Sequence, residues 1–265
     1  MTDIHHQHAA AFRQRFCNRE SLLGTFIKSC GAAPVEIMGR AGFDFVLVDA
    51  EHAPFDRAAV ELSILAARAC GTASIVRVPS ATPQALLAPL DDGASGVMVP
   101  HVRSAQVARD VVAACRYAAG RGFSNSPRAG EYGVRTMWEH VDAADQAVTV
   151  IAMIEDPEAV EEIDAILAVE GIDGVFIGRG DLAVALQDRA PGNPRVARIT
   201  DQVIQACVRA GKPACLLAAH AAEAKALETS GASAFVIASD QGFMRAAATQ
   251  ALGQFRAALP PSTRT

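Results

Sequence analysis

Two acidic residues each follow an apolar stretch of the chain, and their placement suggests that they act together. Glu155 follows the run Val148-Thr-Val-Ile-Ala-Met-Ile, and Asp181 lies just beyond the run Gly174-Val-Phe-Ile-Gly. Each run has the length and the β-branched content of a buried parallel strand. The residues between the runs begin with Asp156-Pro157, a helix-start signal, and continue with apolar residues at helical spacing. This β-α-β pattern places both acids at the C-terminal edge of neighbouring strands.

A divalent cation is the ligand that these two acids would suit. A few oxygen ligands held on rigid strands favour Mg²⁺ or Mn²⁺, which keep water or substrate oxygens in their remaining positions. The alternative is that each acid only caps the helix that follows it, although Asp156-Pro157 already supplies that cap after the first run. A zinc site made from histidines would need an H-x-H or similar cluster at the strand ends, and the sequence has none there.

A histidine with two neighbouring acids is the candidate general base. Asp49, Glu51 and His52 end the apolar run Phe45-Val-Leu-Val. A carboxylate beside an imidazole orients the ring and raises its basicity, so we expect His52 to move protons with Asp49 as its orienting partner. The alternative, a helix N-terminus that carries acidic residues, accounts for Glu51 but poorly for His52.

An arginine and a glycine-containing turn are the candidate substrate-binding groups. Arg77 interrupts the run Ser74-Ile-Val-Arg-Val-Pro. A guanidinium at a strand end needs an anionic partner, which is either a substrate enolate or carboxylate or a buried salt bridge to Asp49. The turn Gly178-Arg-Gly-Asp-Leu leaves bare backbone beside the predicted metal, and the N–H groups at Gly180 and Asp181 suit a substrate carboxylate.

A lysine that forms a Schiff base with a carbonyl substrate is an alternative to chemistry at a metal. Lys28 ends the first predicted strand, whereas Lys212 precedes a strand and Lys225 lies within a predicted helix. Only Lys28 is therefore placed for this chemistry. His101 and His220 also follow predicted strands, and each either supports the site or lies in a loop.

The elements that position these residues alternate regularly along the chain. Glycine recurs just before the strands, as expected where a helix ends and a strand begins. The predicted strands are Leu23–Ser29, Phe45–Glu51, Ala73–Pro79, Gly96–Val102, Val148–Asp156, Gly174–Gly178, Pro213–Ala218 and Ala234–Ser239. The predicted helices are Pro34–Ala41, Arg57–Ala69, Pro83–Leu90, Ala105–Ala118, Pro157–Ala168, Pro194–Ala210, Ala221–Ser230 and Gly242–Ala257.

Eight such repeats predict an α/β fold, a single-domain (β/α)8 TIM barrel spanning residues 21–265. An open doubly wound sheet would usually carry a G-x-G-x-x-G turn after its first strand, and here that strand ends in Lys28-Ser-Cys-Gly. Residues 1–20 form either an N-terminal arm or a leading helix. The longest connection runs from Ala119 to about Met137, and a loop of this length is expected to act as a lid or a subunit contact.

Composition narrows the setting of the protein. The chain has 265 residues, 51% of them hydrophobic, and a net charge of -5, which argues against nucleic acid or an anionic membrane as a partner. Six cysteines are scattered singly, as expected of free thiols in a reducing compartment. The sequence shows neither a signal-peptide pattern nor an apolar run of the roughly 20 residues that a membrane span needs. We expect a cytoplasmic protein.

Four motifs, in this order and spacing, resemble the HpcH/HpaI aldolase family over about Leu22 to Leu259. This family consists of metal-dependent (class II) pyruvate aldolases, among them 4-hydroxy-2-oxoheptanedioate and 2-keto-3-deoxy sugar-acid aldolases. The motifs are Ala41-Gly-Phe-Asp-Phe-Val-Leu-Val-Asp-Ala-Glu-His-Ala-Pro, Val76-Arg-Val-Pro, Asp92-Gly-Ala-Ser-Gly-Val-Met-Val-Pro and Gly171-Ile-Asp-Gly-Val-Phe-Ile-Gly-Arg-Gly-Asp-Leu.

The resemblance implies a role for each of these residues. Glu155 and Asp181 would hold the metal (Mg²⁺ or Mn²⁺, with Co²⁺ or a similar ion as a further option), which pyruvate chelates. Backbone amides at Gly180-Asp181 would also hold the pyruvate carboxylate. Arg77 would stabilise the enolate oxygen, and the Asp49–His52 pair would handle protons together with a water on the metal. Members are typically homohexamers, trimers of dimers, in which neighbouring barrels swap the last helix and active sites lie near subunit contacts.

The predicted activity is that of a carbon–carbon lyase, which reversibly cleaves a 4-hydroxy-2-oxo acid into pyruvate and an aldehyde. The alternatives are a lyase acting on a CoA thioester, similar to the citryl/malyl lyases, and a catalytically silent barrel that binds metal and a 2-oxo acid. One position departs from the family: Met153 stands where glutamine is common, two residues before the metal-binding glutamate. The Arg121-Gly122 pair in the long loop resembles an Arg-Gly pair in the corresponding loop of the family.

Overall fold

Eight parallel strands close into a barrel, in the order of their sequence. The computed structural model describes the backbone of residues 4–259 and the side chains of residues 7–259. The order β1-β2-β3-β4-β5-β6-β7-β8, with β8 paired to β1, confirms the predicted (β/α)8 barrel. The strands are β1 (Leu22–Ile27), β2 (Phe45–Asp49), β3 (Ala73–Arg77), β4 (Gly96–Val99), β5 (Thr149–Ile154), β6 (Gly174–Ile177), β7 (Ala214–Leu217) and β8 (Ala234–Ser239).

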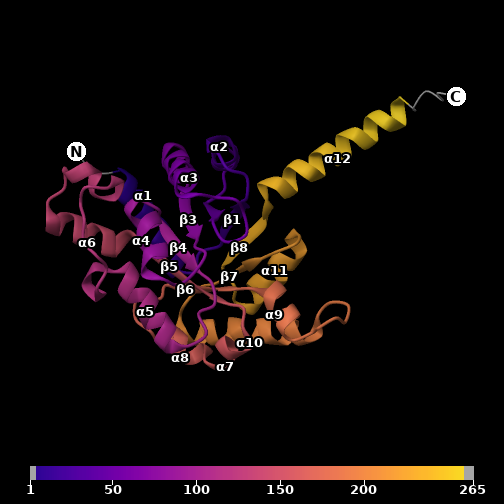
Figure 1. Cartoon of the computed structure of the whole chain (residues 1–265). Helices are drawn as coiled ribbons and strands as arrows, with labels where there is room; N and C mark the ends of the chain where they lie inside the picture. Colours follow the sequence, from indigo (N-terminus) through magenta and orange to yellow (C-terminus); the bar gives the residue numbers. More distant parts are fainter. Residues whose placement is uncertain (1–3, 260–265) are drawn as a thin grey trace.

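Helices follow the strands and surround the barrel (Figure 1). The helix predicted over Pro157–Ala168 is instead two short helices that meet at Glu162. The α-helices are α1 (Ile4–Cys17), α2 (Ala32–Ala41), α3 (Arg57–Cys70), α4 (Pro83–Asp91), α5 (Ala105–Cys115), α6 (Met137–Ala147), α7 (Pro157–Glu161), α8 (Ile163–Leu167), α9 (Arg179–Ala185), α10 (Pro194–Ala210), α11 (Ala221–Ser230) and α12 (Asp240–Ala258). Two 3-10 helices, η1 (Tyr117–Ala119) and η2 (Arg128–Gly133), lie within or beside the long loop.

Two apolar layers hold the barrel together. Leu47, Ile75, Met98 and Ile151 belong to the cluster inside the barrel, and they come from four successive strands. The larger cluster fills the space between the outer face of the sheet and the helices. Because the strands are buried on both faces, they read as continuous apolar runs, which is why all eight were predictable.

The leading helix α1 closes the N-terminal end of the barrel. Phe12 and Phe16 of α1 belong to the interior cluster, together with Phe45 at the start of β2. Of the two alternatives for residues 1–20, the structure therefore contains a leading helix over residues 4–17. Of the N-terminal histidines, His8 is exposed, whereas the side chains of His5 and His6 lie outside the described part of the chain.

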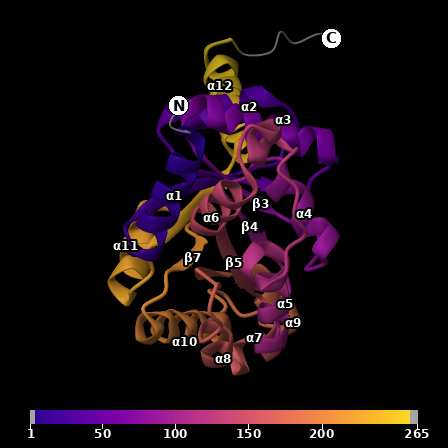
Figure 2. The ribbon, with the colours of Figure 1, turned by 90° about the vertical axis from the view of Figure 1, so that its left-hand side faces the viewer.

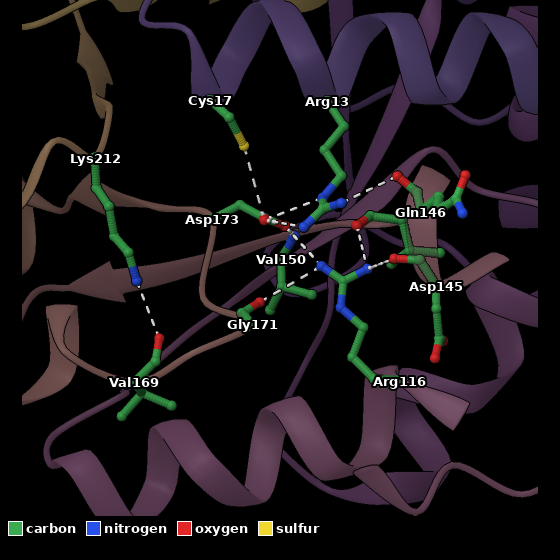
Figure 3. A network of polar contacts seen from close by, with 11 residues as sticks. Arg13, Cys17, Arg116, Asp145, Gln146, Val150, Val169, Gly171, Asp173 and Lys212 are labelled. Carbon is green, nitrogen blue, oxygen red and sulfur yellow. Dashed lines mark hydrogen bonds and ion pairs between the residues drawn. The ribbon is translucent and has the colours of Figure 1, made fainter. Parts of the chain in front are cut away.

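A buried carboxylate joins α1 to the barrel at this end. Asp173, just before β6, accepts hydrogen bonds from Arg13 Nε (3.0 Å) and Nη2 (2.7 Å) of α1 and from Arg116 Nη2 (2.8 Å) after α5. The backbone N–H of Val150 in β5 donates to the same carboxylate at 2.8 Å. Figure 3 shows both guanidinium groups converging on Asp173. Lys212 lies at this end too, where its ammonium donates to the carbonyl of Val169, so it is far from the predicted chemistry.

The last helix does not pack on the barrel along its length. The Asp240 carboxylate accepts from the backbone N–H groups of Lys28 (2.8 Å) and Ser29 (3.0 Å), which anchors the first turn of α12. Beyond that turn the helix projects away from the barrel (Figures 1 and 2). Its apolar side chains Met244, Leu252 and Phe255 are exposed. Within residues 4–259, none of the helices is both long enough and apolar enough to pass through a bilayer.

Candidate active site

The C-terminal ends of the strands surround a cavity of about 610 Å³. Its lining includes Arg77 from the end of β3, Met153 from β5 and the turn Gly178–Asp181 after β6. The cavity therefore opens at the end of the barrel where the chemistry of this fold is expected. It brings together predicted residues that are far apart in the sequence.

Asp49 and Arg77 form a buried, two-pronged ion pair at this end of the barrel. Arg77 Nε donates to Asp49 Oδ1 at 2.9 Å, and Nη2 donates to Oδ2 at 2.8 Å. The ammonium of Lys28 also pairs with Oδ2. Burial opposes ionisation of Asp49, but the hydrogen bonds from Arg77 and Lys28 outweigh it and lower the pKa of the carboxyl to about 2. The buried salt bridge between Arg77 and Asp49, one of the two alternatives predicted for Arg77, is therefore present.

The ion pair with Asp49 fixes the Arg77 guanidinium but leaves some of its N–H groups free to bind another oxygen. The guanidinium carbon lies 5.0 Å from the centre of the Phe26 ring, a cation–π contact that holds the group from one side. Glu51 Oε2 lies 3.4 Å from Arg77 Nε. Arg77 still lines the cavity, so its remaining N–H edge is available to an oxygen bound there.

The imidazole of His52 does not contact Asp49, contrary to the predicted pairing. The backbone N–H of His52 donates to Asp49 Oδ1 at 3.1 Å, while the ring Nε2 lies 3.8 Å from Glu51 Oε2. The side chain of His52 is 61% exposed. The chain leaves the strand after Asp49 and turns, which directs the ring of His52 outward and makes Glu51 its nearest carboxylate.

Glu155 is a buried carboxylate: its Oε1 accepts a hydrogen bond, and its Oε2 lies beside Gly178. It is 3% exposed, and its Oε1 accepts from the backbone N–H of His101 at 2.8 Å. Burial raises its pKa, and the neighbouring Asp181 and Glu51 raise it further, whereas His101 acts in the opposite direction. A Cβ atom at Gly178 would lie 3.0 Å from Oε2 and 2.5 Å from the Glu155 Cβ, so only glycine leaves this space open.

The Asp181 side of the site is built on the turn between β6 and α9. The Gly178 N–H donates to the carbonyl of Ile154 at 3.0 Å, which ties the turn to the end of β5. Asp181 lies in the first turn of α9. A Cβ atom at Gly180 would meet nothing within 4 Å, so the backbone there faces open space. Two neighbouring carboxylates, one of them buried, and the space that Gly178 leaves beside Oε2 fit a divalent cation.

A second polar cluster at the strand ends was only partly anticipated. His101 Nδ1 lies 2.9 Å from Asp156 Oδ2 and 3.4 Å from Glu155 Oε1, and Arg103 Nη2 lies 3.1 Å from Asp156 Oδ1. The hydrogen bond to Asp156 and the charge of Glu155 raise the pKa of His101, against the opposing effects of burial and Arg103. Asp156 was expected to cap the next helix, but its carboxylate makes no such bond and is occupied by His101 and Arg103 instead. His101 therefore supports Glu155.

Two groups singled out in the sequence have structural partners. Lys28, weighed as a Schiff-base lysine, has its ammonium against Asp49. The ring Nδ1 of His220 accepts the backbone N–H of Glu223 at 3.1 Å, so His220 caps α11. Sequence reasoning overlooked the pairing of Arg179 Nη1 with Glu223 Oε1 at 2.7 Å on the wall of the cavity. The sequence signal was weak: Arg179 follows β6 closely, and Glu223 lies in the first turn of the helix after β7.

Comparisons with known proteins identify the family of the chain. The model of the HpcH/HpaI aldolase/citrate lyase family matches residues 22–247. The 5-keto-4-deoxy-D-glucarate aldolase of Klebsiella pneumoniae subsp. pneumoniae is 31% identical over 248 residues, which cover 92% of this chain and 96% of the relative.

Solved structures of similar proteins have the same fold. A HpcH/HpaI aldolase/citrate lyase family protein from Burkholderia cenocepacia J2315 superposes with a TM-score of 0.88 at 28% identity, covering 93% of this chain and 99% of that one. For the HpcH/HpaI aldolase from Desulfitobacterium hafniense DCB-2, the TM-score is 0.86 at 26% identity, with coverage of 96% and 98%. The chain is a carbon–carbon lyase of the aldolase type and belongs to the HpcH/HpaI aldolase/citrate lyase family.

Proposed function

We propose that the protein reversibly cleaves a 4-hydroxy-2-oxo acid into pyruvate and an aldehyde. The observation that carries this proposal is that the fixed Arg77 and Asp181 line one cavity at the C-terminal end of the barrel, while the buried Glu155 lies against Gly178 in its wall and close to Asp181. Cleavage of the C3–C4 bond leaves an electron pair on the pyruvate fragment, and a site that stabilises the resulting enolate lowers the barrier.

Glu155 and Asp181 are the residues that would hold a divalent cation, Mg²⁺ or Mn²⁺, with Co²⁺ or a similar ion as a further option. When bound, such a cation supplies Lewis-acid stabilisation of negative charge on oxygen. His101 keeps Glu155 in place through its backbone N–H, which leaves Oε2 free to bind. The pairing of two carboxylates explains why the site would be electrostatically unfavourable without a cation.

Arg77 binds the oxygen on which charge develops. Its guanidinium is fixed on one side by Asp49 and on its face by Phe26, so its free edge is oriented before the substrate arrives. A donor that needs no reorganisation stabilises the transition state more than a mobile one. Asp49 thus acts on the reaction by positioning Arg77, in addition to fixing the His52 backbone.

His52, or a water bound in the site, would accept the C4 hydroxyl proton during cleavage and return it in the synthetic direction. The side chain of His52 is exposed beside Glu51 at the end of β2, so a proton can pass between the ring and solvent. The open backbone at Gly180 and the N–H of Asp181 suit the carboxylate of the pyruvate fragment.

Deuterium exchange tests this function directly. The protein is incubated with pyruvate in D₂O, with and without EDTA, and the methyl proton signal is followed by NMR. Exchange that EDTA abolishes supports an enolate formed with the help of a cation. Exchange that persists in EDTA, together with inactivation by borohydride and pyruvate, would assign the chemistry to Lys28. Absence of exchange in both conditions would favour a binding protein without activity.

We further propose that the protein is a homo-oligomer, a hexamer of paired barrels that exchange their last helices. In a regular barrel the helix after the eighth strand covers the outer face of β8 and β1. Here α12 projects away, and that outer face carries an apolar groove of about 420 Å³ lined by residues such as Leu23, Phe235 and Ile237. The exposed apolar side chains of α12 fit such a groove on a second copy of the chain.

The six cysteines are all unpaired in the described residues, which is consistent with a reducing compartment, and we place the protein in the cytoplasm.

The sequence also left two other activities open, a lyase acting on a CoA thioester and a silent metal-binding barrel. Neither gains support from the geometry of the described residues. The aldolase reaction accounts for Arg77, Glu155 and Asp181 together.

A further inference from the structure

A second arginine lines the cavity on the side opposite Arg77. Arg179 begins α9 after β6, and its Nη2 donates to the carbonyl of Leu217 at 2.6 Å, so the guanidinium lies close to the end of β7. In the closed order of eight strands, β7 is opposite β3, which carries Arg77. Both arginines line the same cavity. A substrate whose reacting end is held at Arg77 therefore has Arg179 available for its other end.

Glu223, in the first turn of α11, fixes Arg179 from one side. Its Oε1 accepts from Arg179 Nη1 at 2.7 Å, and its Oε2 accepts the backbone N–H of Ala219 at 2.7 Å. Together with the bond to the β7 carbonyl, this contact holds the tip of the guanidinium at two points. Arg179 is therefore oriented before a substrate arrives, and binding to it costs little side-chain freedom.

The Arg179–Glu223 pair keeps unused hydrogen-bond donors, whereas both oxygens of its carboxylate are engaged. The bonds to Glu223 and Leu217 use one N–H group on each Nη nitrogen of Arg179. The Nε–H and the second N–H group on each Nη nitrogen have no partner within residues 7–259, and the Arg179 side chain is 29% exposed, so these donors remain accessible. A carboxylate, whose two oxygens match the fork of a guanidinium, is the ligand that suits them.

The floor of the cavity is apolar. Phe26 of β1, Met153 of β5 and Phe176 of β6 line it, and all three are buried members of the cluster inside the barrel. Because these side chains offer no strong hydrogen-bond partner, an aliphatic chain suits the floor. The polar groups of a substrate then belong at the rim, where the two arginines lie.

From this geometry we infer that Arg179 is a specificity-determining residue, which binds a terminal carboxylate on the aldehyde fragment while the aliphatic part of that fragment crosses the apolar floor. The inference rests on the proposed function, because it concerns the second substrate of the same site. Arg77 acts on charge that develops during the reaction. Arg179 binds a charge that stays the same throughout, so its contribution is expected in substrate binding and not in the chemical step.

A matched pair of aldehydes tests the inference. Succinic semialdehyde and butanal have the same four-carbon chain and differ at the far end, where one has a carboxylate and the other a methyl group. Aldol addition to pyruvate is measured for each with the metal-loaded protein, and kcat/KM for the semialdehyde is expected to exceed that for butanal by about tenfold or more. Equal values, or a preference for butanal, would overturn the inference.

A substitution assigns this preference to Arg179. In Arg179→Met, the ratio of kcat/KM for the semialdehyde to kcat/KM for butanal is expected to fall by about tenfold, mainly through a higher KM for the semialdehyde. Because the ratio is taken within one variant, a loss of activity from a structural role of Arg179 cancels. An unchanged ratio would overturn the inference.

Arg189→Met is the matched control. Arg189 is an exposed arginine in the connection between α9 and α10, where its Nη2 donates to the side chain of Gln187. It is not among the described residues that line the cavity. The control removes the same charge from a nearby position, so its aldehyde ratio should equal that of the wild type. A fall as large as that of Arg179→Met would assign the preference to general electrostatics and overturn the inference.

The exchange of pyruvate methyl protons involves no aldehyde, so it separates the possible failures. If Arg179 held the carboxylate of pyruvate instead, Arg179→Met would need more pyruvate for half-maximal exchange and would keep the aldehyde ratio, which would overturn the inference. EDTA-sensitive exchange without a preference for the semialdehyde would leave the proposed function intact and overturn the inference alone. Absence of exchange and of aldol product with either aldehyde would overturn the proposed function, and the inference would fall with it.

Discussion

Arg77 and Asp49 are joined by two parallel hydrogen bonds across neighbouring strands, Nε to Oδ1 at 2.9 Å and Nη2 to Oδ2 at 2.8 Å. The two residues are directly paired in the register of β2 and β3. Asp49 is fully buried and Arg77 nearly so. A guanidinium fixed in this way can bind an oxygen on its remaining edge without first losing side-chain freedom.

Replacing Asp49 by Asn should therefore reduce catalysis through Arg77. We expect kcat of D49N to fall by about 100-fold, since the amide cannot hold the guanidinium in the same two-pronged arrangement. Steady-state aldol cleavage measures the effect, and circular dichroism checks the fold. Arg77→Lys, which keeps the charge but loses the fork geometry, should be impaired to a similar extent. A D49N protein with wild-type kcat would contradict the positioning role.

The same pair makes stability depend on pH in the acid range. The folded-state pKa of Asp49 is lowered to about 2 from its ordinary value of 3.8. The stabilisation is therefore fully present above pH 3.8 and is lost as the pH falls toward 2, and it amounts to about 2 kcal/mol. Urea unfolding at pH 6 and at pH 3 measures about half of this change, because the rest is lost only as the pH falls from 3 toward 2 and below. The D49N protein should lose less stability than the wild type over the same interval, and an equal loss would exclude Asp49 as the cause.

Glu155 is predicted to set the affinity for the divalent cation. E155Q removes the buried negative charge, so we expect Mn²⁺ binding, measured by isothermal titration calorimetry, to weaken by about 100-fold or more. Glu158 provides the matched control, because it is an acid three residues along the chain and is exposed. E158Q should bind Mn²⁺ as the wild type does. Equal affinities for E155Q and the wild type would remove Glu155 from the metal site.

Asp173 is predicted to matter for stability and not for chemistry. It lies at the N-terminal end of the barrel, is 5% exposed at its side chain and pairs with Arg13 and Arg116 (Figure 3). D173N leaves two guanidinium groups without their shared anion, and we expect a loss of about 3 kcal/mol in the free energy of unfolding.

The control for this prediction is Asp164, whose ion pair with Arg209 is exposed, with 75% of the Asp164 side chain accessible. D164N should change the free energy of unfolding by less than about 0.5 kcal/mol. Urea denaturation of both variants gives the comparison, and pyruvate exchange should stay near the wild-type rate in both. A stable D173N protein would show that the α1 contacts are carried by Phe12 and Phe16 instead.

The sequence allowed the barrel and much of the site to be predicted, for definable physical reasons. Strands buried on both faces read as apolar runs, and residues that end such runs must meet at one end of the barrel. This argument placed Glu155, Asp181 and Arg77 at one end of the barrel, where Arg77 and Asp181 line one cavity and Glu155 lies against Gly178 in its wall. It could not direct the ring of His52, because the chain turns immediately after Asp49 and strand periodicity no longer applies.

Contacts between residues on different repeats were beyond the reach of the sequence. Asp156 was expected to cap a helix, but His101 and Arg103, which follow the preceding strand in the barrel, take both of its oxygens. Arg179 and Glu223 are likewise brought together by the adjacency of β6 and β7. Each of these pairings depends on three-dimensional distance and rotamer, which local patterns do not specify.

The projecting helix α12 leads to a prediction about assembly. If its apolar side chains pack in the groove of another copy, a charge introduced there should dissociate the oligomer. We expect the wild type to elute as an oligomer in size-exclusion chromatography with light scattering, and F255E to show a lower mass. Phe255 is 66% exposed in the single chain, so the substitution costs the isolated barrel little. Q254E, the same charge on the adjacent exposed residue, should keep the wild-type mass. A monomeric wild type would contradict helix exchange, and so would an F255E protein of unchanged mass.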